Sequence, residues 1–202
     1  MIAIGIDPSM NSTGICILKY DDNDNIISEH FFIVKPNKLT RNEKQAQEQN
    51  ENIHYELYEK TDLKPYNDEN LYHEFYKSKN ICNIGDAIYK VIKNNIEENE
   101  EIYIVQEGIS YGSKIRTKAI YDLAGLNYIL RYIMLRDTCV HMCVCPPSNI
   151  KKFATDNGNC PKEMIVNAFI DKHKDLSLPK IDDIADAYFM ACYAHHLKFS
   201  EK

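Results

Sequence analysis

Four acidic residues stand where their carboxylates could share divalent metal ions. Asp7 ends the apolar run IAIGID, and Glu107 ends a second apolar run, IYIVQE. Asp183 and Asp186 are three residues apart in DDIADAY, a spacing that puts both side chains on one face of the first turn of a helix. Two carboxylates so close repel each other unless a cation lies beside them. These residues therefore favour a pair of divalent metals held between two strand ends and a helix terminus.

Structural roles for the same acids remain open at this point. Asp182 or Asp183 could cap the last helix and interact favourably with its dipole. Asp186 lies beyond the reach of those effects and adjoins the apolar run AYFMACYA, where an unpaired charge is costly. Any one acid at a strand end is common, so the metal interpretation depends on the four acids together.

The elements that would position these acids follow from hydrophobic periodicity. Alternating or continuous β-branched runs predict strands, and apolar residues at helical spacing predict helices. The predicted strands are IAIGID, TGICILKY, IISEHFFIV, EIYIVQEG and CVHMCVC, and the predicted helices cover 81–96, 120–135, 149–154, 161–173 and 182–199. Three antiparallel strands followed by strands with crossover helices give an α/β fold, a ribonuclease H-like mixed five-stranded sheet flanked by helices.

Residues 37–79 fit this plan poorly, because they are rich in Asn, Glu, Gln, Lys and Tyr and have little aliphatic periodicity. We interpret them as a polar insertion after the third strand, with helical turns around 42–59. It is either a solvated excursion or a clamp or partner surface built on its tyrosines. The remainder forms one domain, so residues 1–202 are expected to be a single domain that carries this insertion.

Length and composition restrict the function classes. The 202 residues are 44% hydrophobic and 27% charged, enough for one well-buried domain. The sequence has no run of 18 apolar residues and no signal peptide pattern, and its seven cysteines do not form a disulfide framework, so an intracellular protein that is neither secreted nor membrane-bound is expected. Residues 102–181 hold 11 Lys and Arg against 7 Asp and Glu, a net +4, whereas the remainder is net −10. Such a basic stretch beside carboxylates is typical of a site that holds phosphates near metal ions.

The run CVHMCVC also suggests zinc, because Cys139, His141, Cys143 and Cys145 alternate on one face of a strand. Alternate side chains of an extended strand are roughly 7 Å apart, so four of them cannot converge on one ion. We therefore interpret these cysteines as small apolar residues of a buried strand.

Four motifs in order resemble the RuvC-type Holliday junction resolvases, especially phage and viral members. They are GIDPSMNSTGICIL, IYIVQEG, PPSNIKKFATDNGNCPKEMI and DDIADAY, and the resemblance covers residues 1–34 and 81–199. It implies a homodimeric, magnesium-dependent endodeoxyribonuclease that nicks two opposed strands of a four-way DNA junction and leaves 5′ phosphate and 3′ hydroxyl ends. In this resemblance Asp7, Glu107, Asp183 and Asp186 are the catalytic metal ligands. They would hold two Mg²⁺ ions about 4 Å apart, with Mn²⁺ as a substitute.

The resemblance also assigns basic residues. Lys162 matches a catalytic lysine near the scissile phosphate, and either Lys151 or Lys152 matches a further DNA contact. The loop SYGSKIRTK is expected to bind the phosphates of the junction arms. Its candidate DNA-binding residues are the basic Lys114, Arg116 and Lys118 and, as the residue that stacks at the crossover, Tyr111.

Alternative functions keep the same fold. A nuclease for flaps, forks or other branched DNA would need the same acids, whereas a non-catalytic DNA-binding module would not. A sugar kinase or actin-like ATPase needs two tandem lobes around a nucleotide, and 202 residues provide one, so no nucleotide cofactor is expected. A homodimer matches the two-fold symmetry of a junction.

Overall fold

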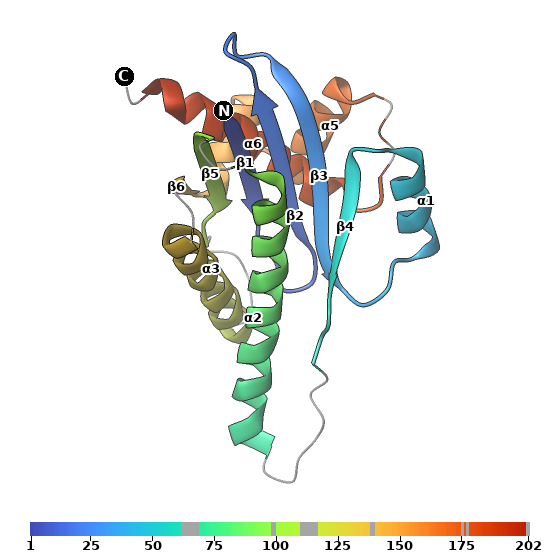
Figure 1. The fold of residues 1–202 in the computed structure, drawn as a ribbon, viewed down its shortest axis with the longest axis vertical. Helices are drawn as coiled ribbons and strands as arrows, with labels where there is room; N and C mark the ends of the chain where they lie inside the picture. The colour runs from blue at the N-terminus through green and yellow to red at the C-terminus, as the bar shows by residue number, and fades with distance from the viewer. Residues whose placement is uncertain are drawn as a thin grey trace.

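The computed structural model describes residues 1–61, 69–97, 100–109, 117–137, 140–174, 176 and 178–200. Its centre is a mixed sheet in the order β4-β3-β2-β1-β5-β6 (Figure 1). The strands are β1 (Ile2–Asp7), β2 (Thr13–Tyr20), β3 (Ile26–Pro36), β4 (Ile53–Tyr58), β5 (Ile102–Glu107) and β6 (His141–Cys145). β1, β2 and β3 form an antiparallel meander, while β5 and β6 extend it in parallel with β1.

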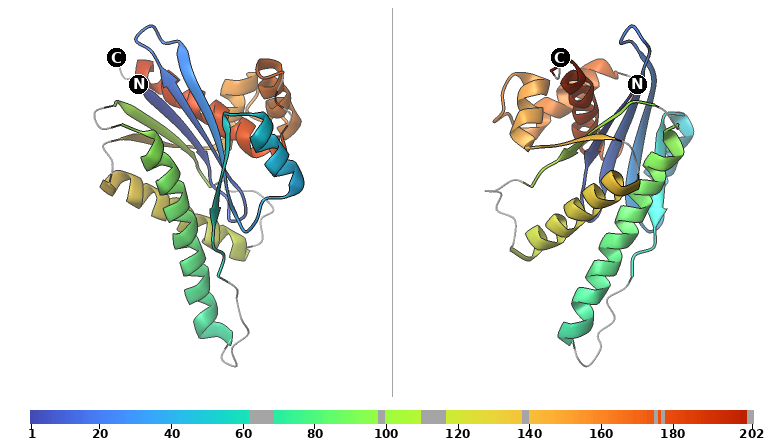
Figure 2. Two further views of the ribbon diagram at one scale, coloured as in Figure 1. Left: turned by 45° about the vertical axis from the view of Figure 1, so that its right-hand side comes forward. Right: turned by 60° about the vertical axis from the view of Figure 1, so that its left-hand side comes forward.

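Helices cover both faces of the sheet, as the two views of Figure 2 show. They are α1 (Arg41–Gln49), α2 (Glu69–Asn95), α3 (Thr117–Asp137), α4 (Pro147–Thr155), α5 (Lys162–Lys172) and α6 (Ile181–Ser200). α2 and α3 pack on one face, where the even-numbered isoleucines of β1 are buried. α6, with α4 and α5 against it, covers the other face over Ala3, Cys16 and Phe31. The period of two in the strands thus assigns alternate side chains to two separate cores.

In the part of the chain that the structure describes, the sheet has six strands, so the predicted number of five is wrong. The extra strand, β4, comes from the segment that we interpreted as a polar insertion, and it pairs in parallel with β3 at the edge of the sheet. The same segment also supplies α1 and the start of α2. Tyr58 of β4 is buried in the core beneath α2, so part of this polar segment completes the domain.

α1 begins with a complete capping box. The Thr40 side chain accepts the backbone N–H of Glu43, and the Glu43 carboxylate accepts the backbone N–H of Thr40. Glu43 also forms an ion pair with Lys35 of β3, with an Nζ–Oε1 distance of 2.6 Å. The start of α1 is therefore fixed to the sheet by one buried carboxylate.

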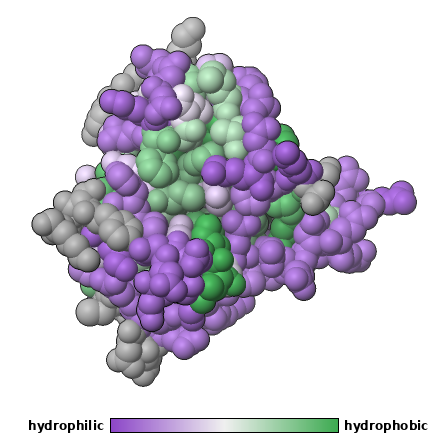
Figure 3. All heavy atoms as spheres, turned by 90° about the horizontal axis from the view of Figure 1, so that it is seen from above, coloured by the Kyte–Doolittle hydropathy of each residue, from purple (hydrophilic) through white to green (hydrophobic). Residues whose placement is uncertain are grey.

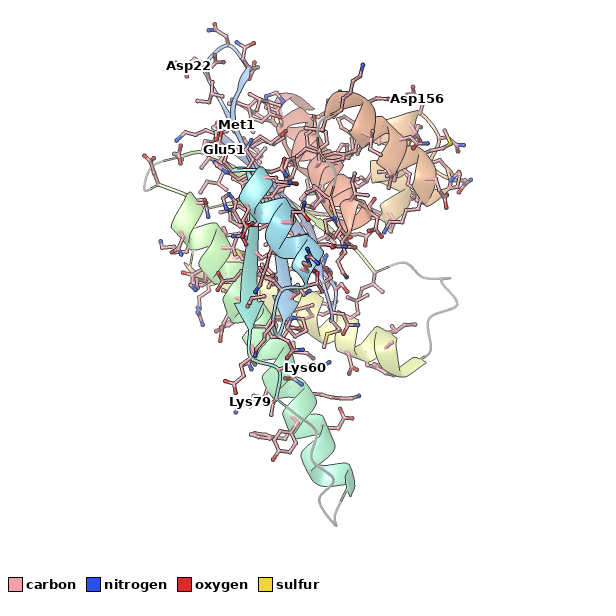
Figure 4. The ribbon with its side chains drawn as sticks, turned by 90° about the vertical axis from the view of Figure 1, so that its right-hand side faces the viewer. Met1, Asp22, Glu51, Lys60, Lys79 and Asp156 are labelled. Carbon is pink, nitrogen blue, oxygen red and sulfur yellow. The ribbon has the colours of Figure 1, made fainter. Side chains whose placement is uncertain are left out.

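Residues 59–61, which follow β4, are bound to α2 by two asparagines. Asn80 accepts the backbone N–H of Thr61 at 2.7 Å and donates to its carbonyl at 3.2 Å, and Asn83 donates to the carbonyl of Glu59. Figure 4 shows the neighbouring Lys60 and Lys79 on these two segments, where α2 leaves the body of the protein. The amide side chains thus satisfy backbone N–H and C=O groups that would otherwise need a neighbouring strand as their partner.

The end of the sheet at which β1 begins is shown in Figure 3. Hydrophilic residues cover most of this end, and the hydrophobic ones form a central area with smaller patches below it and to its right. No helix in the described part of the chain is long and apolar enough to cross a membrane. The predicted acids lie at the opposite end, where β1 and β5 finish.

Candidate active site

Asp7 and Glu107 are brought together by the parallel pairing of β1 and β5. The register joins Ile6 to Gln106, so the next residues, Asp7 and Glu107, end adjacent strands side by side. Both have the same parity as Ala3 of β1 and Val105 of β5, which are buried under α6. The two predicted strand-end acids therefore lie on the α6 face of the sheet.

Two glycines allow α6 to approach this face closely. A Cβ atom on Gly5 of β1 would lie 1.9 Å from the carbonyl oxygen of Ala187, and one on Gly14 of β2 would lie 2.2 Å from that of Asp183. No residue with a side chain fits in either position without moving the helix. The sequence thus places the backbone of α6 directly against the two strands, with Asp183 and Asp186 beside Asp7.

Hydrogen bonds and ion pairs hold the helix acids. Ser12 Oγ donates to Asp183 Oδ2 at 2.7 Å, and Lys180 Nζ lies 3.9 Å from the same oxygen. Lys162 Nζ lies 3.3 Å from Asp186 Oδ2 and 3.2 Å from Asp182 Oδ2. Lys162 therefore reaches the acids from the first residue of α5.

Sequence reasoning missed Ser12. It is buried in the turn between β1 and β2, which is closed by two hydrogen bonds between Thr13 and Ser9. Tyr58 of β4 also donates to the carbonyl of Met10 in this turn. A hydroxyl five residues after Asp7 was a visible signal, but its partner, Asp183, is 171 residues away and follows from the approach of α6.

Burial and mutual repulsion raise the pKa of the strand-end acids. Burial is the main cause for Asp7, whose pKa lies well above its ordinary value, and the charges of Glu107, Asp186 and Asp183 raise it further. The pKa of Glu107 is also raised, chiefly by burial, although its hydrogen bond with Asp7 and the charge of Lys162 act in the opposite direction. The site therefore holds more negative charge than its surroundings compensate.

The helix acids show the same imbalance. Burial raises the pKa of Asp183 despite its bond from Ser12, and burial raises the pKa of Asp186 despite the charge of Lys162. Within the described residues, no three His, Cys, Asp or Glu side chains converge closely enough to hold a metal ion as they stand. The charges of Glu107, Asp183 and Asp186 nevertheless all act on Asp7, so the four acids belong to one site, with Lys162 and Ser12 bound to the two helix acids.

The two candidate lysines of α4 differ in position. Lys151 Nζ donates to the carbonyl of Cys160 at 2.9 Å, and its charge lowers the pKa of Glu107, so it lies on the side of the acids. Lys152 is exposed and lies near the end of α4, close to Asp156, which Figure 4 labels. Lys151 is the better match to the basic contact that the motif predicts.

The basic loop after Glu107 lies mostly outside the described residues. This applies to Tyr111, Lys114 and Arg116, while Lys118 belongs to α3 without a described side chain. Among the residues whose pattern suggested zinc, Cys143 and Cys145 have their Sγ atoms 3.8 Å apart, and Cys139 is outside the described residues. Burial raises the pKa of Cys145 to about 12, as befits an apolar thiol rather than a metal ligand. β6 is nevertheless an edge strand in which only Cys145 is buried, so the predicted buried strand is wrong.

A groove of about 630 Å³ lies between α3, the end of β6 and the residues that follow β5. Gly108, the residue after Glu107, forms part of its wall, together with Tyr121, Tyr128 and Arg131 of α3 and Ser148 of α4. The groove was not predicted, since its walls come from three separate parts of the sequence.

Comparisons with known proteins agree with this arrangement. Neither a protein-family model nor a curated protein sequence matches the chain. RuvC of Thermus thermophilus superposes with a TM-score of 0.61 at 14% identity, over 99% of this chain and 97% of RuvC. T. thermophilus RuvC in complex with Holliday junction substrate gives 0.57 at 12% identity, over 100% and 96%. The yeast mitochondrial Holliday junction resolvase Ydc2 gives 0.51 at 16% identity, over 97% and 80%.

These likenesses extend over nearly the whole of this chain and include the strands and the helix that carry the four acids. They agree with the mixed sheet, with helices on both of its faces, described above. The chain therefore has the ribonuclease H-like fold of the RuvC-type Holliday junction resolvases.

Proposed function

We propose that this protein is a metal-dependent, structure-selective endonuclease that resolves four-way DNA junctions by paired symmetric nicks. The observation that carries the proposal is the cluster of Asp7, Glu107, Asp183 and Asp186, in which burial raises the pKa of every member and the charge of at least one neighbouring carboxylate raises it further. Such a cluster is costly unless a cation enters it, and perturbed acids of this kind concentrate at functional sites.

The donor set suits Mg²⁺, because all four side chains offer carboxylate oxygens, which hard cations prefer. We expect these acids to hold two ions, with Mn²⁺ as a substitute. When bound, the metals would activate the attacking water and stabilise the leaving 3′ oxygen, giving 5′ phosphate and 3′ hydroxyl ends. The chain itself contributes the fixed separation of the acids, set by the backbone contacts of α6 with β1 and β2.

Lys162 has a distinct role in this proposal. Its ammonium group lies between Asp186 and Asp182 and is half exposed, so it can also contact a phosphate at the edge of the site. There it would stabilise the negative charge that develops on the phosphate oxygens. Lys151, on the side of Glu107, would add a second positive charge.

The partner that we propose is branched DNA bound by a homodimer. Acids alone would repel DNA, but residues 102–181 have a net charge of +4, and they include Lys151 and Lys162 beside the site. A two-fold protein would present two such sites to two opposed strands of a junction. Binding is then expected to weaken strongly with salt, because the DNA contacts are phosphate contacts.

Cleavage of a synthetic four-way junction tests the proposal, with a linear duplex, a flap and a fork as competing substrates. We expect ligatable paired nicks in the junction with Mg²⁺, and none with EDTA or with Asp7→Asn. Lys162→Met should lower the cleavage rate at least tenfold, whereas Lys172→Met, at the far end of the same helix, should not. Equal cutting of flaps or forks would indicate a broader branched-DNA nuclease, and the absence of metal-dependent cutting would contradict the proposal.

A further inference from the structure

Two amide side chains meet inside the apolar core on the α3 side of the sheet. Gln106 of β5 is 0% exposed and Asn127 of α3 is 1% exposed. Gln106 has the parity of Ile104, and Asn127 adjoins Leu126, and both of these apolar residues belong to that core. Burial of a polar side chain is costly unless it finds a hydrogen-bond partner, so the position of this pair calls for an explanation.

The amide oxygen of Asn127 joins three side chains. It accepts from Gln106 Nε2 at 2.6 Å and from Arg131 Nη2 at 3.3 Å, while Asn127 Nδ2 donates to the carbonyl of Leu123 at 3.2 Å. Gln106 Oε1 and Arg131 Nε are buried without a partner among the described residues. A network that is only partly satisfied stabilises a fold less than apolar side chains would, because each unpaired group has lost its water without replacement. The network therefore favours a role other than stability.

The network holds the last residue of β5 that pairs with strands on both sides. Gln106 pairs with Ile6 of β1 and with Val144 of β6, whereas the register with β1 ends there and Glu107 pairs with Cys145 of β6. Neighbouring residues of a strand point to opposite faces, so Gln106 enters the α3-side core while Glu107 faces α6. The Gln106 side chain thus anchors the peptide group that carries Glu107 from the opposite face of the sheet.

We propose that Asn127 and Gln106 are positioning residues, which hold Glu107 where it can share a metal ion with Asp7. Both side chains lie in the core on the other face of the sheet, so they act through the backbone of β5. The hydrogen bond also ties β5 to α3, the helix that follows the loop after Glu107, so a displacement of α3 would move the acid. The inference rests on the proposed function, since it takes Glu107 as a metal ligand.

The chemistry of the expected metal makes the position of Glu107 critical. Mg²⁺ requires nearly octahedral geometry, with oxygen ligands at about 2.1 Å, so a carboxylate displaced by about 1 Å ceases to be a ligand. Asn127 would therefore affect metal affinity, although it contacts none of the four acids. A hydrogen bond that serves stability alone is the alternative, and its loss would destabilise the fold without changing metal affinity.

Four variants of the full chain separate the two roles. Asn127→Leu removes the shared acceptor, and Asn127→Asp keeps an acceptor for both donors. Gln106→Met combined with Asn127→Leu replaces both partners by apolar groups, which costs little stability, so this variant is expected to fold. Asn80→Leu is the matched control, because Asn80 is also a buried helical asparagine with two hydrogen bonds, which it forms with Thr61 and not with β5.

Four measurements are made on each variant. Electron paramagnetic resonance gives the affinity for Mn²⁺ in the absence of DNA, and urea unfolding gives the stability. Single-turnover cleavage of a four-way junction is followed over a range of Mg²⁺ concentrations, and junction binding is measured in EDTA. The Mn²⁺ affinity does not depend on cleavage, so it tests the inference even when the proposed function fails.

We expect Asn127→Leu to weaken Mn²⁺ binding roughly tenfold and to raise the Mg²⁺ concentration for half-maximal cleavage by the same factor, with junction binding unchanged. Asn127→Asp should keep the wild-type Mn²⁺ affinity, and adding Gln106→Met to Asn127→Leu should cause no further loss. Asn80→Leu should lower the urea midpoint and leave the Mn²⁺ affinity unchanged.

Wild-type Mn²⁺ affinity in Asn127→Leu would overturn the inference, and so would an equal loss of affinity in Asn80→Leu, since any loosening of the fold would then suffice. A wild-type protein that binds Mn²⁺ without cutting the junction would overturn the proposed function alone, and the Mn²⁺ affinities of the variants would still decide the inference. A wild-type protein that binds no Mn²⁺ would overturn both.

Discussion

Gly14→Ala tests whether the close approach of α6 to the sheet sets the geometry of the site. The added Cβ would lie 2.2 Å from the carbonyl oxygen and 2.7 Å from the carbonyl carbon of Asp183. Ordinary contacts begin at 3.4 Å, so the two backbones must separate by about 1.2 Å. Both clashing atoms belong to the main chain, so no flexible side chain can give way.

The displaced residue is itself one of the four acids, so the change should affect both stability and cleavage. Overpacking of this kind costs about 1–3 kcal/mol of unfolding free energy. A misplacement of about 1 Å in a catalytic group lowers the rate by about 100-fold. We therefore expect Gly14→Ala to lose roughly two orders of magnitude in junction cleavage at saturating Mg²⁺ while it still folds.

Urea unfolding and single-turnover cleavage measure the two effects. Gly125→Ala in α3 is the matched control, because its Cβ would meet the flexible end of Ile81 at 3.3 Å and a helical Gly-to-Ala change favours the helix by up to about 1 kcal/mol. Gly14→Ala with the stability and cleavage rate of the wild-type protein would refute the reasoning that main-chain contact places Asp183.

Three further predictions concern charge and stability. Without divalent metal, Asp7→Asn should raise the unfolding free energy by about 1 kcal/mol, because it removes a buried charge beside three carboxylates; an unchanged or lower value in EDTA would contradict this. Burial lowers the pKa of His173, but its hydrogen bond with Glu29 and the charge of that residue outweigh this and leave the pKa above 6.5. The contact between His173 and Glu29 therefore stabilises the fold fully below pH 6.5, and this stabilisation is lost as the pH rises through the folded-state pKa. His173→Gln should remove that part of the decline in urea midpoints measured between pH 6 and 9. Lys35→Met should cost about 3 kcal/mol in urea unfolding, since it leaves Glu43, whose side chain is 4% exposed, without its cation; a loss below 1 kcal/mol would show that Thr40 alone compensates the charge.

The sequence predicted the parts of the fold that repeat a simple pattern. β1, β2, β3 and β5 show continuous or alternating β-branched residues, and α6 begins at a visible pair of aspartates. Those patterns sufficed to place Asp7 and Glu107 at strand ends. Parallel pairing of β1 with β5 then made them neighbours, as the assumed fold required.

The missing sixth strand had a weaker signal. IHYELY in β4 contains two polar residues, His54 and Glu56, and two tyrosines among its six residues, and the strand lies at the edge of the sheet beside β3. The start of α1 was detectable, since Thr40 and Glu43 have the spacing of a capping box. The early start of α2, at Glu69, had no such local signal.

The candidate site was predictable in its acids and less so in what surrounds them. Ser12 and the choice of Lys151 over Lys152 depend on contacts between residues far apart in the sequence. The groove likewise depends on the meeting of α3, α4 and two strand ends. Local periodicity carries no information about such tertiary contacts, because each partner has the pattern of an ordinary surface residue in its own segment.

Asn80 and Asn83 of α2 bind residues 61 and 59. They therefore hold together the two ends of the segment 61–80, whatever its sequence. Asn80 meets Thr61 through two hydrogen bonds, so residues 61 and 80 stay adjacent whatever lies between them. Lengthening a loop whose ends are already joined adds little entropic cost, about 0.6 kcal/mol for each doubling of its length. The part of this segment that precedes α2, residues 62–68, is therefore a suitable place to insert a fluorescent or affinity module, and such a fusion would report on DNA binding while it leaves the acids and the groove untouched.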